Sequence, residues 1–433
     1  MPASSSPPTR VVIIDGKRTP FLRSGTQFSG LMAYDLGRMA VAGLMSHTRL
    51  DPSEVGLLVM GNVIQEVKTS NLGREVALGA GLDLTVPAFT VTMACVSSLQ
   101  SFLSCAQAIQ AGQAEVAIAA GAELLSDVPI RVSRPMRKRL IAAQKVKGPL
   151  GYFSLLGGLS LKDLAPEAPA IAEFSTGEVM GQNCERLVKR LGIGREEQDE
   201  YALMSHQRAA WATEQGLLAP QIEAAYVPPF DEPLAADNGF HAGTSLEKLG
   251  RLRPAFDKRL GTVTAGNSSF LTDGAGAVLL ASEAAAQRLG LVPLAYLKSV
   301  SVTALDPLEE LLLGPALSIP RALAQAGLKL GQVEVLELHE AFAGQVLSVL
   351  KLLNDETWCR QRLGRQEPVG EVDLDRLNAW GGSLSVGHPF GATGARLITT
   401  CCHRMAREKA QYGLVAACAA GALGIGMLLE TVS

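Results

Sequence analysis

The sequence predicts an α/β protein whose first and last thirds share one plan. Short apolar runs bounded by glycine, typical of fully buried strands, alternate with runs whose apolar residues recur at helical spacing. The order of these runs in the first third returns, with weak identity, in the last third. Between them lies a proline-rich segment with few β-branched runs. At 433 residues and 47% hydrophobic content, the chain can bury a large core and form two or three domains.

The first third alternates strands and helices. We expect a strand at 10–14, a helix at about 33–46 and a strand at 56–60. An apolar segment then leads into a helix at 96–111, which glycine ends, and a buried strand follows at 115–120. This part, residues 1–128 completed by 257–287, is the predicted N-terminal domain.

The middle of the chain reads as an inserted, mostly helical loop domain at 129–256. One helix is expected to begin at the capping-box pattern Ser175-x-x-Glu178, and a second to cover about 195–215. The α/β pattern then returns, with a turn at Asp273-Gly274 before a strand at 277–281.

The last third, 288–433, is the predicted C-terminal domain. A helix at 316–325 precedes a strand at 333–338, and a helix at 395–409 precedes two buried strands within 414–429. A duplicated α/β domain places two equivalent sheet edges face to face, which creates a natural cleft.

Composition excludes several classes of protein. The net charge is only −3 with acids and bases mixed, so we expect no nucleic-acid partner. The first ten residues lack the apolar core of a secretory signal, and the seven cysteines follow no pattern, so we expect reduced thiols and a cytoplasmic location. Cys401-Cys402-His403 is no metal site in this interpretation, because neighbours on a helix point roughly 100° apart. We expect no metal.

Cys95 is the first candidate for chemistry. It lies where an apolar strand meets a helix, and the free N–H groups of a helix N-terminus favour a thiolate. A lowered thiol pKa separates reactive cysteines from inert ones. Most free cysteines are buried and structural, however, so position alone leaves both interpretations open.

Three further reactive groups stand at the ends of predicted strands or in a glycine-rich turn. His339 and Cys418 each follow a buried strand, and His388 lies in the glycine-rich stretch 381–389. Ligand sites of open α/β sheets gather at the carboxyl ends of strands. Each histidine alone could be a satisfied core residue, but together with Cys95 they predict a nucleophilic enzyme site. No dinucleotide or P-loop glycine motif occurs.

At these positions the chain resembles the thiolase family over residues 10–430. His339-Glu340-Ala341-Phe342 and Cys95-Val96-Ser97-Ser98 resemble in particular the subgroup that belongs to the fatty-acid oxidation trifunctional complex. The other marks of the resemblance are Asp15-Gly16-x-Arg18-Thr19-Pro20-Phe21, Met93-Ala94, Ala265-Gly266-Asn267-Ser268-Ser269, Gly387-His388-Pro389 and Cys418-Ala419-Ala420-Gly421.

The resemblance implies a fold and a set of catalytic roles. The fold would be two duplicated five-stranded αβα domains stacked as αβαβα. Cys95 would carry the acyl group, and His388 would activate it and help to bind the thioester oxygen. Cys418 would be the acid/base, since a thiol pKa of ~8.5 lies near working pH. His339 would help to build an oxyanion site through a water.

It also implies binding groups. The backbone N–H groups of Cys95 and Ala420 resemble a second oxyanion hole, and Ser269 resembles the serine that contacts the pantetheine arm of coenzyme A. Ala422-Leu423 depart from the glycine-rich pattern of relatives, which puts the freedom of that loop in question.

The function implied is thiolytic cleavage of a 3-ketoacyl-CoA to acetyl-CoA and a shortened acyl-CoA, with coenzyme A as substrate and no permanently bound cofactor. One alternative is the same site run in reverse as a biosynthetic acetoacetyl-CoA thiolase. A decarboxylating ketoacyl synthase would lack Cys418. A non-catalytic lipid-binding protein of the same fold is the alternative from another class.

The implied partners are a second copy of the chain and a hydratase/3-hydroxyacyl-CoA dehydrogenase subunit in an α2β2 complex. The segment from Arg131 to Leu161 adds a peripheral membrane contact as a hypothesis, because basic residues there precede apolar ones. A solvated basic face is the simpler alternative. The residues concerned are Arg131, Arg134, Arg137, Lys138, Arg139, Lys145 and Lys147, then Tyr152, Phe153, Leu155, Leu156, Leu159 and Leu161.

Overall fold

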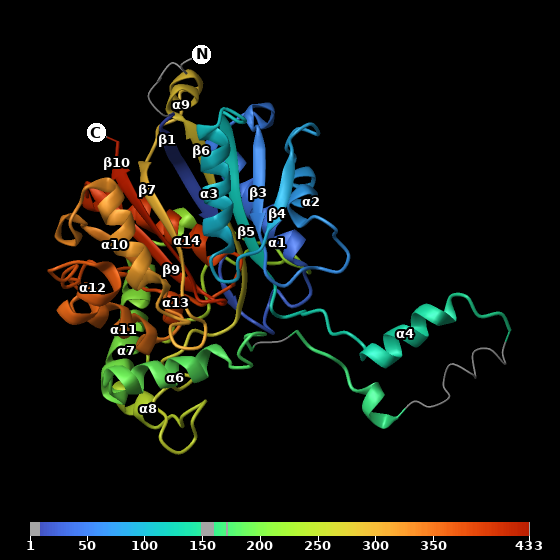
Figure 1. Ribbon diagram of the computed structural model, residues 1–433. Helices are drawn as coiled ribbons and strands as arrows, with labels where there is room; N and C mark the ends of the chain where they lie inside the picture. The colour runs from blue at the N-terminus through green and yellow to red at the C-terminus, as the bar shows by residue number, and fades with distance from the viewer. Residues whose placement is uncertain (1–8, 149–159, 170–171, 433) are drawn as a thin grey trace, which may run out of the picture.

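The computed structural model describes residues 9–148, 160–169 and 172–432, and it has the predicted α/β architecture (Figure 1). The described strands form one mixed ten-stranded sheet in the order β4-β3-β5-β6-β1-β7-β10-β9-β8, with β2 paired to β6. Their bounds are β1 Val11–Arg18, β2 Leu22–Arg23, β3 Leu57–Gly61, β4 Ala88–Val91, β5 Val116–Glu123, β6 Thr272–Ser282, β7 Ala295–Ala304, β8 Val335–Leu338, β9 Tyr412–Ala419 and β10 Leu423–Thr431.

The sheet consists of two halves with the same pairing pattern. In the first half, β3 pairs in parallel with β4 and β5, while β6 pairs antiparallel with β5 and β1. In the second, β8 pairs in parallel with β9, and β10 pairs antiparallel with β9 and β7. A single parallel bridge from Leu336 to Leu377 stands where β4 stands in the first half. The predicted duplication is therefore confirmed, with this bridge in place of a full fifth strand.

Helices lie between and outside the two halves (Figure 1). Helix α14 (Thr393–Glu408) contacts strands of both halves and also contacts α3 (Ser97–Gln110), which packs on the first half, so the two helices form the middle layer. Helix α1 (Ala33–Thr48) covers the outer face of the first half, and α10 (Gly314–Ala326) covers that of the second. Smaller helices flank them: α2 Leu72–Gly79, α9 Glu283–Leu289, α11 Ala343–Leu353, α12 Glu356–Leu363 and α13 Ser383–Val386.

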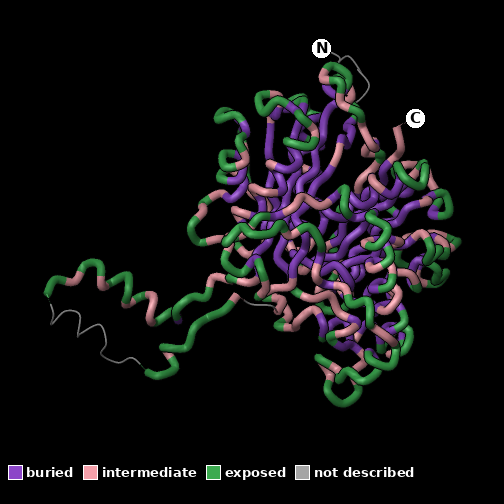
Figure 2. The backbone as a smooth tube through the Cα atoms, turned by 180° about the vertical axis from the view of Figure 1, so that it is seen from behind, coloured by how far each residue is buried: buried purple, intermediate pink, exposed green. Residues whose placement is uncertain are grey.

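Three large apolar cores of the described residues hold these layers together. Figure 2 shows the buried residues concentrated in the interior of the body. The central core joins residues of α3 and α14 to both halves of the sheet, for example Phe102, Leu397 and Val415. Two outer cores lie under α1 and under α10. Because α3 and α14 both pack into the central core, the first turns of these two helices are fixed relative to each other.

Between β5 and β6 the helices and strands of the described residues are all helices, but these helices cover fewer than half of the described residues, so the segment is less helical than predicted. Helices α6 (Met180–Leu191) and α7 (Arg195–Glu214) pack against α11, and α8 covers Leu246–Gly250. Helix α4 (Arg134–Ala143) instead stands away from the body, and no residue of α4 is buried (Figures 1 and 2). The domain boundaries 1–128, 129–256, 257–287 and 288–433 stay predictions.

Two local predictions were wrong. The Ser175-x-x-Glu178 pattern does not cap a helix, because α6 begins after Val179, whose N–H donates to the Gln182 side chain at 3.0 Å. Asp273-Gly274 is not a turn but lies inside β6. There the Asp273 carboxylate accepts N–H groups of Leu125 and Ser126 at 2.7 and 3.0 Å, so a buried strand tolerates the charge.

In the described part of the chain, no helix combines the length and the apolar character that crossing a membrane requires.

Candidate active site

Cys95 sits in a tight, strained turn between β4 and α3. Ala94 has φ +46°, a left-handed conformation that costs a non-glycine residue roughly 1–2 kcal/mol. The Ser97 hydroxyl holds the turn, since it accepts the Met93 N–H at 2.8 Å and donates to the Ala94 carbonyl at 2.7 Å. The result is a cysteine presented directly before the first turn of α3.

His388 is placed by a second turn, which leads into α14. Gly387 has φ +99°, and a Cβ there would lie 2.2 Å from Cγ2 of Thr272, so only glycine fits. The His388 N–H then donates to the Phe270 carbonyl at 3.3 Å. At the next turn the Ala395 N–H donates to the Ser98 hydroxyl at 3.0 Å, which ties the starts of α3 and α14 together.

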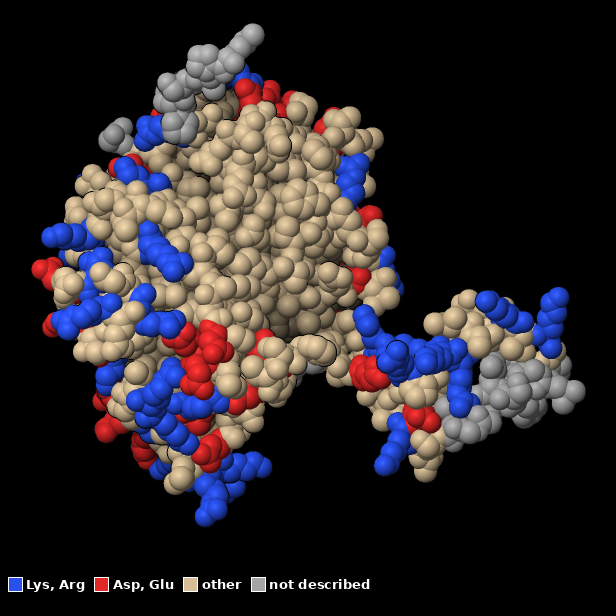
Figure 3. Space-filling model, viewed as in Figure 1, with Lys and Arg blue, Asp and Glu red and all other residues tan. Residues whose placement is uncertain are grey.

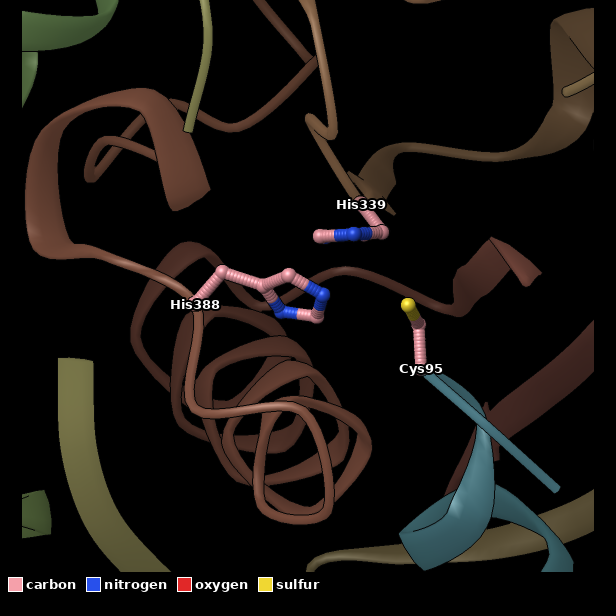
Figure 4. Close-up of side chains that lie close together, drawn as sticks. All are labelled: Cys95, His339 and His388. Carbon is pink, nitrogen blue, oxygen red and sulfur yellow. The ribbon is translucent and has the colours of Figure 1, made fainter. Parts of the chain in front are cut away.

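His339 completes a cluster with the other two (Figure 4). It follows β8, its N–H donates to the Ala416 carbonyl at 2.9 Å, and its ring centroid lies 4.1 Å from that of His388. One sulfur or ring nitrogen from each of Cys95, His339 and His388 lies within 4.8 Å of the others. The sulfur of Cys95 points toward the two rings (Figure 4). Residues from both halves of the fold therefore converge on one point, as the sequence predicts.

Both histidines are neutral at neutral pH. Burial, and then the charge of Arg396, lowers the pKa of His388 to about 3. Burial, His388 and Arg396 lower the pKa of His339 well below its usual value. A neutral imidazole can accept a proton through one nitrogen and donate through the other.

Cys95 differs from the other six cysteines because it is partly exposed while they are buried. The expected lowering of its thiol pKa was wrong. Burial raises the pKa of Cys95 to about 11, although the N–H groups of Ala420 and of Cys95 itself act in the opposite direction. Dehydration of the sulfur outweighs the helix N-terminus, so Cys95 rests as a thiol that needs a base.

Cys418 lies in β9 close enough to Cys95 for the two thiols to affect each other electrostatically. The expectation that its thiol pKa lies near working pH was also wrong. Burial, and then Cys95, raises the pKa of the Cys418 thiol. The structure thus brings Cys418 to the predicted place, with its proton firmly held.

The predicted binding groups lie around this centre. The Ala420 and Cys95 N–H groups both bond to the Cys95 sulfur, as donors of an oxyanion hole would. Ser269 donates its N–H to the Ala341 carbonyl at 3.0 Å, and it lies two residues before Leu271, which bridges to His388. The loop that carries Ala422 in place of a glycine makes a tight turn. Ala422 has φ +57° beside Gly421 at φ +80°, so it adopts the left-handed conformation without a second glycine.

Two acidic residues of the site were not foreseen. Glu123, fully buried at the end of β5, accepts N–H groups of Val63, Ile64 and Gly391 at 3.1, 2.8 and 2.9 Å, and burial raises its pKa to about 7. Glu173, from the inserted segment, accepts the Gly421 N–H at 2.7 Å. The sequence does hold a signal for Glu123, because it is the single charged residue at the end of the apolar run 116–122. No local signal marked Glu173.

Cys401-Cys402-His403 forms no metal cluster among the described residues. His403 hydrogen-bonds instead to the Asp15 carboxylate through Nε2 at 2.8 Å, and the two cysteines are buried.

Comparison with known families decides where this site belongs. The description "Thiolase, N-terminal domain" matches residues 11–284, and "Thiolase, C-terminal domain" matches residues 291–431. The chain belongs to the thiolase family. Thiolases are acyltransferases, and the resemblance of the sequence motifs is confirmed.

Curated relatives cover nearly the whole chain. "Trifunctional enzyme subunit beta, mitochondrial" of Bos taurus is 47% identical over 420 residues, which is 97% of this chain and 88% of the relative. "3-ketoacyl-CoA thiolase" of Pectobacterium carotovorum is 46% identical over 421 residues, which is 97% of this chain and 96% of the relative.

Solved structures confirm the thiolase fold. Human mitochondrial 3-ketoacyl-CoA thiolase matches with a TM-score of 0.84 at 30% identity, over 98% of this chain and 99% of that one. The same human enzyme in complex with CoA matches with a TM-score of 0.83 over 98% of both chains.

Proposed function

We propose that this thiolase cleaves 3-ketoacyl-CoA with coenzyme A, through an acyl group carried on Cys95. The observation that carries the proposal is a partly exposed thiol facing two neutral imidazoles, with a second thiol beside it. Relatives named as 3-ketoacyl-CoA thiolase and trifunctional enzyme subunit beta support the substrate class and a place in fatty-acid β-oxidation.

The first half of the reaction forms a bond from sulfur to carbon. His388 takes the Cys95 proton, and the thiolate attacks the 3-keto carbon. The N–H groups of Cys95 and Ala420 hold the resulting oxyanion, and one such donor is typically worth ~3–4 kcal/mol. The bond between C2 and C3 then breaks, leaving an acyl group on Cys95 and an acetyl-CoA enolate, whose oxygen His339 and His388 stabilise.

Cys418 supplies the proton that the enolate carbon needs. Release of acetyl-CoA leaves Cys418 as a thiolate beside the acyl-enzyme. Coenzyme A then gives its thiol proton to Cys418, and its thiolate attacks the acyl group. The shortened acyl-CoA leaves, and the released Cys95 sulfur takes back the proton that His388 holds. We place Ser269 along the pantetheine arm, because its segment pairs with His388.

Cys418→Ala tests this division of roles. The wild-type protein should exchange the α-protons of acetyl-CoA with deuterium from solvent, and Cys418→Ala should slow that exchange ~100-fold or more. Alkylation of Cys95 by iodoacetamide should remain. Cys105→Ala, which also removes a buried thiol, serves as the control. Exchange at the wild-type rate in Cys418→Ala would transfer the acid/base role to another group.

We further propose that the chain works as a homodimer with a hydratase/3-hydroxyacyl-CoA dehydrogenase subunit, in a cytoplasmic-type compartment. The arm formed by 129–148 and 160–169 supports an additional contact with an anionic membrane. It carries clustered Lys and Arg (Figure 3) and exposed apolar side chains such as Ile141 at 63% and Leu161 at 88%. The residues Tyr152, Phe153, Leu155, Leu156 and Leu159 lie outside the described residues.

Charge reversal tests the arm. Arg137, Lys138 and Arg139 changed together to glutamate should abolish co-sedimentation with anionic liposomes or co-purification with the partner subunit. Thiolysis of a short substrate should persist. The same charge change at the exposed Arg253, Lys258 and Arg259 is the control. Unchanged behaviour in both association assays would make the arm an ordinary solvated basic face.

A further inference from the structure

The two imidazoles of the site present their Nε2 atoms to the same space. In the described structure both Nε2 atoms are buried without a hydrogen-bond partner, while both Nδ1 atoms are held by hydroxyl groups. Since both rings are neutral, each carries one proton, and the Nδ1 partner decides which nitrogen has it. The hydroxyl group that holds Nδ1 belongs to Thr393 in His388 and to Ser383 in His339, and these two hydroxyls have different hydrogen-bond partners of their own.

His388 is held by Thr393. The Thr393 hydroxyl has one proton, and it lies 3.1 Å from the Pro389 carbonyl, which can only accept. With that proton donated to Pro389, the oxygen accepts from His388 Nδ1, 2.6 Å away. This leaves a lone pair on His388 Nε2.

His339 is held by Ser383, and the direction is reversed. Nη2 of Arg396 lies 2.9 Å from the Ser383 hydroxyl, and an arginine can only donate. The Ser383 proton is therefore free for His339 Nδ1, 2.9 Å away. That leaves the His339 proton on Nε2.

The guanidinium of Arg396 is itself held deep inside the protein. Arg396 is 2% exposed, and its Nη1 lies 3.7 Å from the Glu337 carboxylate. Glu337 is 1% exposed and also accepts from Arg404 at 2.9 Å. Such a buried cation with a fixed fork cannot reverse its role toward Ser383.

We infer that Arg396 and Ser383 are positioning residues that hold His339 as an Nε2–H donor, while Thr393 holds His388 as an Nε2 acceptor. The inference rests on the proposed function for its consequence: His388 takes the thiol proton, and His339 is a donor to the enolate oxygen from the outset. It also predicts poor binding of Zn²⁺ to Cys95, His339 and His388, although their spacing would suit a metal, because His339 Nε2 offers no lone pair.

Nitrogen NMR on the wild-type protein tests the tautomers directly, without any assay of activity. With histidine labelled with ¹⁵N, His339 should show Nε2 protonated and Nδ1 bare, and His388 the opposite. His339→Asn and His388→Asn assign the signals. Protonation of Nδ1 in His339, or the same tautomer in both rings, would overturn the inference. Failure of the proposed thiolysis would leave this readout unchanged.

Ser383→Ala tests the consequence. It should release His339 from its single tautomer and lower kcat for thiolysis roughly tenfold to hundredfold, with KM for coenzyme A unchanged. Alkylation of Cys95, which depends on His388, should stay within about twofold. Ser385→Ala is the control, since Ser385 lies in the same short helix but bonds to Ser205 and Gly382. Equal kcat values for the two variants would contradict the inference.

Discussion

At the scale of single residues, the reactive thiol and its base are both neutral at rest. Burial raises the pKa of Cys95 to about 11 and lowers that of His388 to about 3. We expect the charged pair to form when substrate binds, because the N–H groups of Cys95 and Ala420 are already in place to stabilise the oxyanion that develops.

His388 should therefore show no titration between pH 5 and 8. Its folded pKa lies below the unfolded value of ~6.5, so the neutral ring persists down to about pH 3. By linkage, the stability that the buried neutral ring contributes is present above the unfolded pKa and is lost as pH falls toward the folded pKa. The ring ¹H–¹³C signals of His388, assigned with His388→Asn, would measure this. A midpoint near 6.5 would contradict it.

Sequence reasoning found the residues that we propose to act on the substrate, but not those that we infer to position them. Cys95, His339, His388 and Cys418 stood out because reactive groups at strand ends are unusual. Ser383 passed as an ordinary residue of a glycine-rich turn. Its role depends on Arg396 and His339 together, and a sequence pattern records no such contact between distant segments. The direction of the thiol pKa shifts was likewise out of reach, because burial depends on the packed structure.

At the scale of elements, the site depends on how closely α3 and α14 begin beside each other. A Cβ on Gly394 would lie 2.7 Å from the Leu99 backbone nitrogen and 2.8 Å from the Ser98 hydroxyl. The bond from the Ala395 N–H to that hydroxyl is next to this contact. Glycine at this position thus sets the distance between the turn of Cys95 and the turn of His388.

Gly394→Ala should separate the two helices. We expect a loss of about 1–3 kcal/mol in the free energy of unfolding, as for overpacked cores, together with slower alkylation of Cys95. Chemical denaturation and iodoacetamide kinetics would measure the two effects. Gly30→Ala, where a Cβ meets nothing within 4 Å, should leave both unchanged. Equal stability of the two variants would show that the helix spacing is not critical.

Elements were predicted well where periodicity was long, and poorly where a single residue decided the boundary. The middle helices α3 and α14 follow from their apolar spacing. The start of α6 did not follow from Ser175 and Glu178, because the Gln182 side chain caps the backbone four residues later than Ser175 would. The sequence predicted a turn at Asp273, because a charged residue is unusual inside a buried strand. The N–H groups that stabilise its carboxylate come from Leu125 and Ser126, which lie in a distant part of the sequence.

At the scale of the whole molecule, the duplicated sheet ends in an open edge. β4 is the terminal strand of the sheet order, it carries no charged residue, and Phe89 within it is 41% exposed. Natural monomers protect such edges with charge or cover. The edge lies four residues before Cys95 and is the surface that we expect a second copy to cover. The duplication itself could be predicted from element order, whereas the edge emerged only from the pairing.

Phe89→Glu should therefore weaken the proposed homodimer. The mass measured by light scattering should fall toward that of a single chain, and thiolysis should fall with it because the turn of Cys95 loses support. Val292→Glu places the same charge on another exposed apolar residue, 81% exposed, and should leave the mass unchanged. A dimer of full strength in Phe89→Glu would place the interface elsewhere.

The central claim is that the acyl group passes through Cys95, and mass spectrometry of the intact protein tests it most directly. Wild-type protein mixed with a medium-chain 3-ketoacyl-CoA, without coenzyme A, should gain one acyl group that peptide mapping places on Cys95. Coenzyme A should then remove it. Cys95→Ser should gain none and lose thiolysis by ~10⁴-fold or more, whereas Cys105→Ser should behave as wild type. An acyl group on another residue, or thiolysis that persists in Cys95→Ser, would contradict the account.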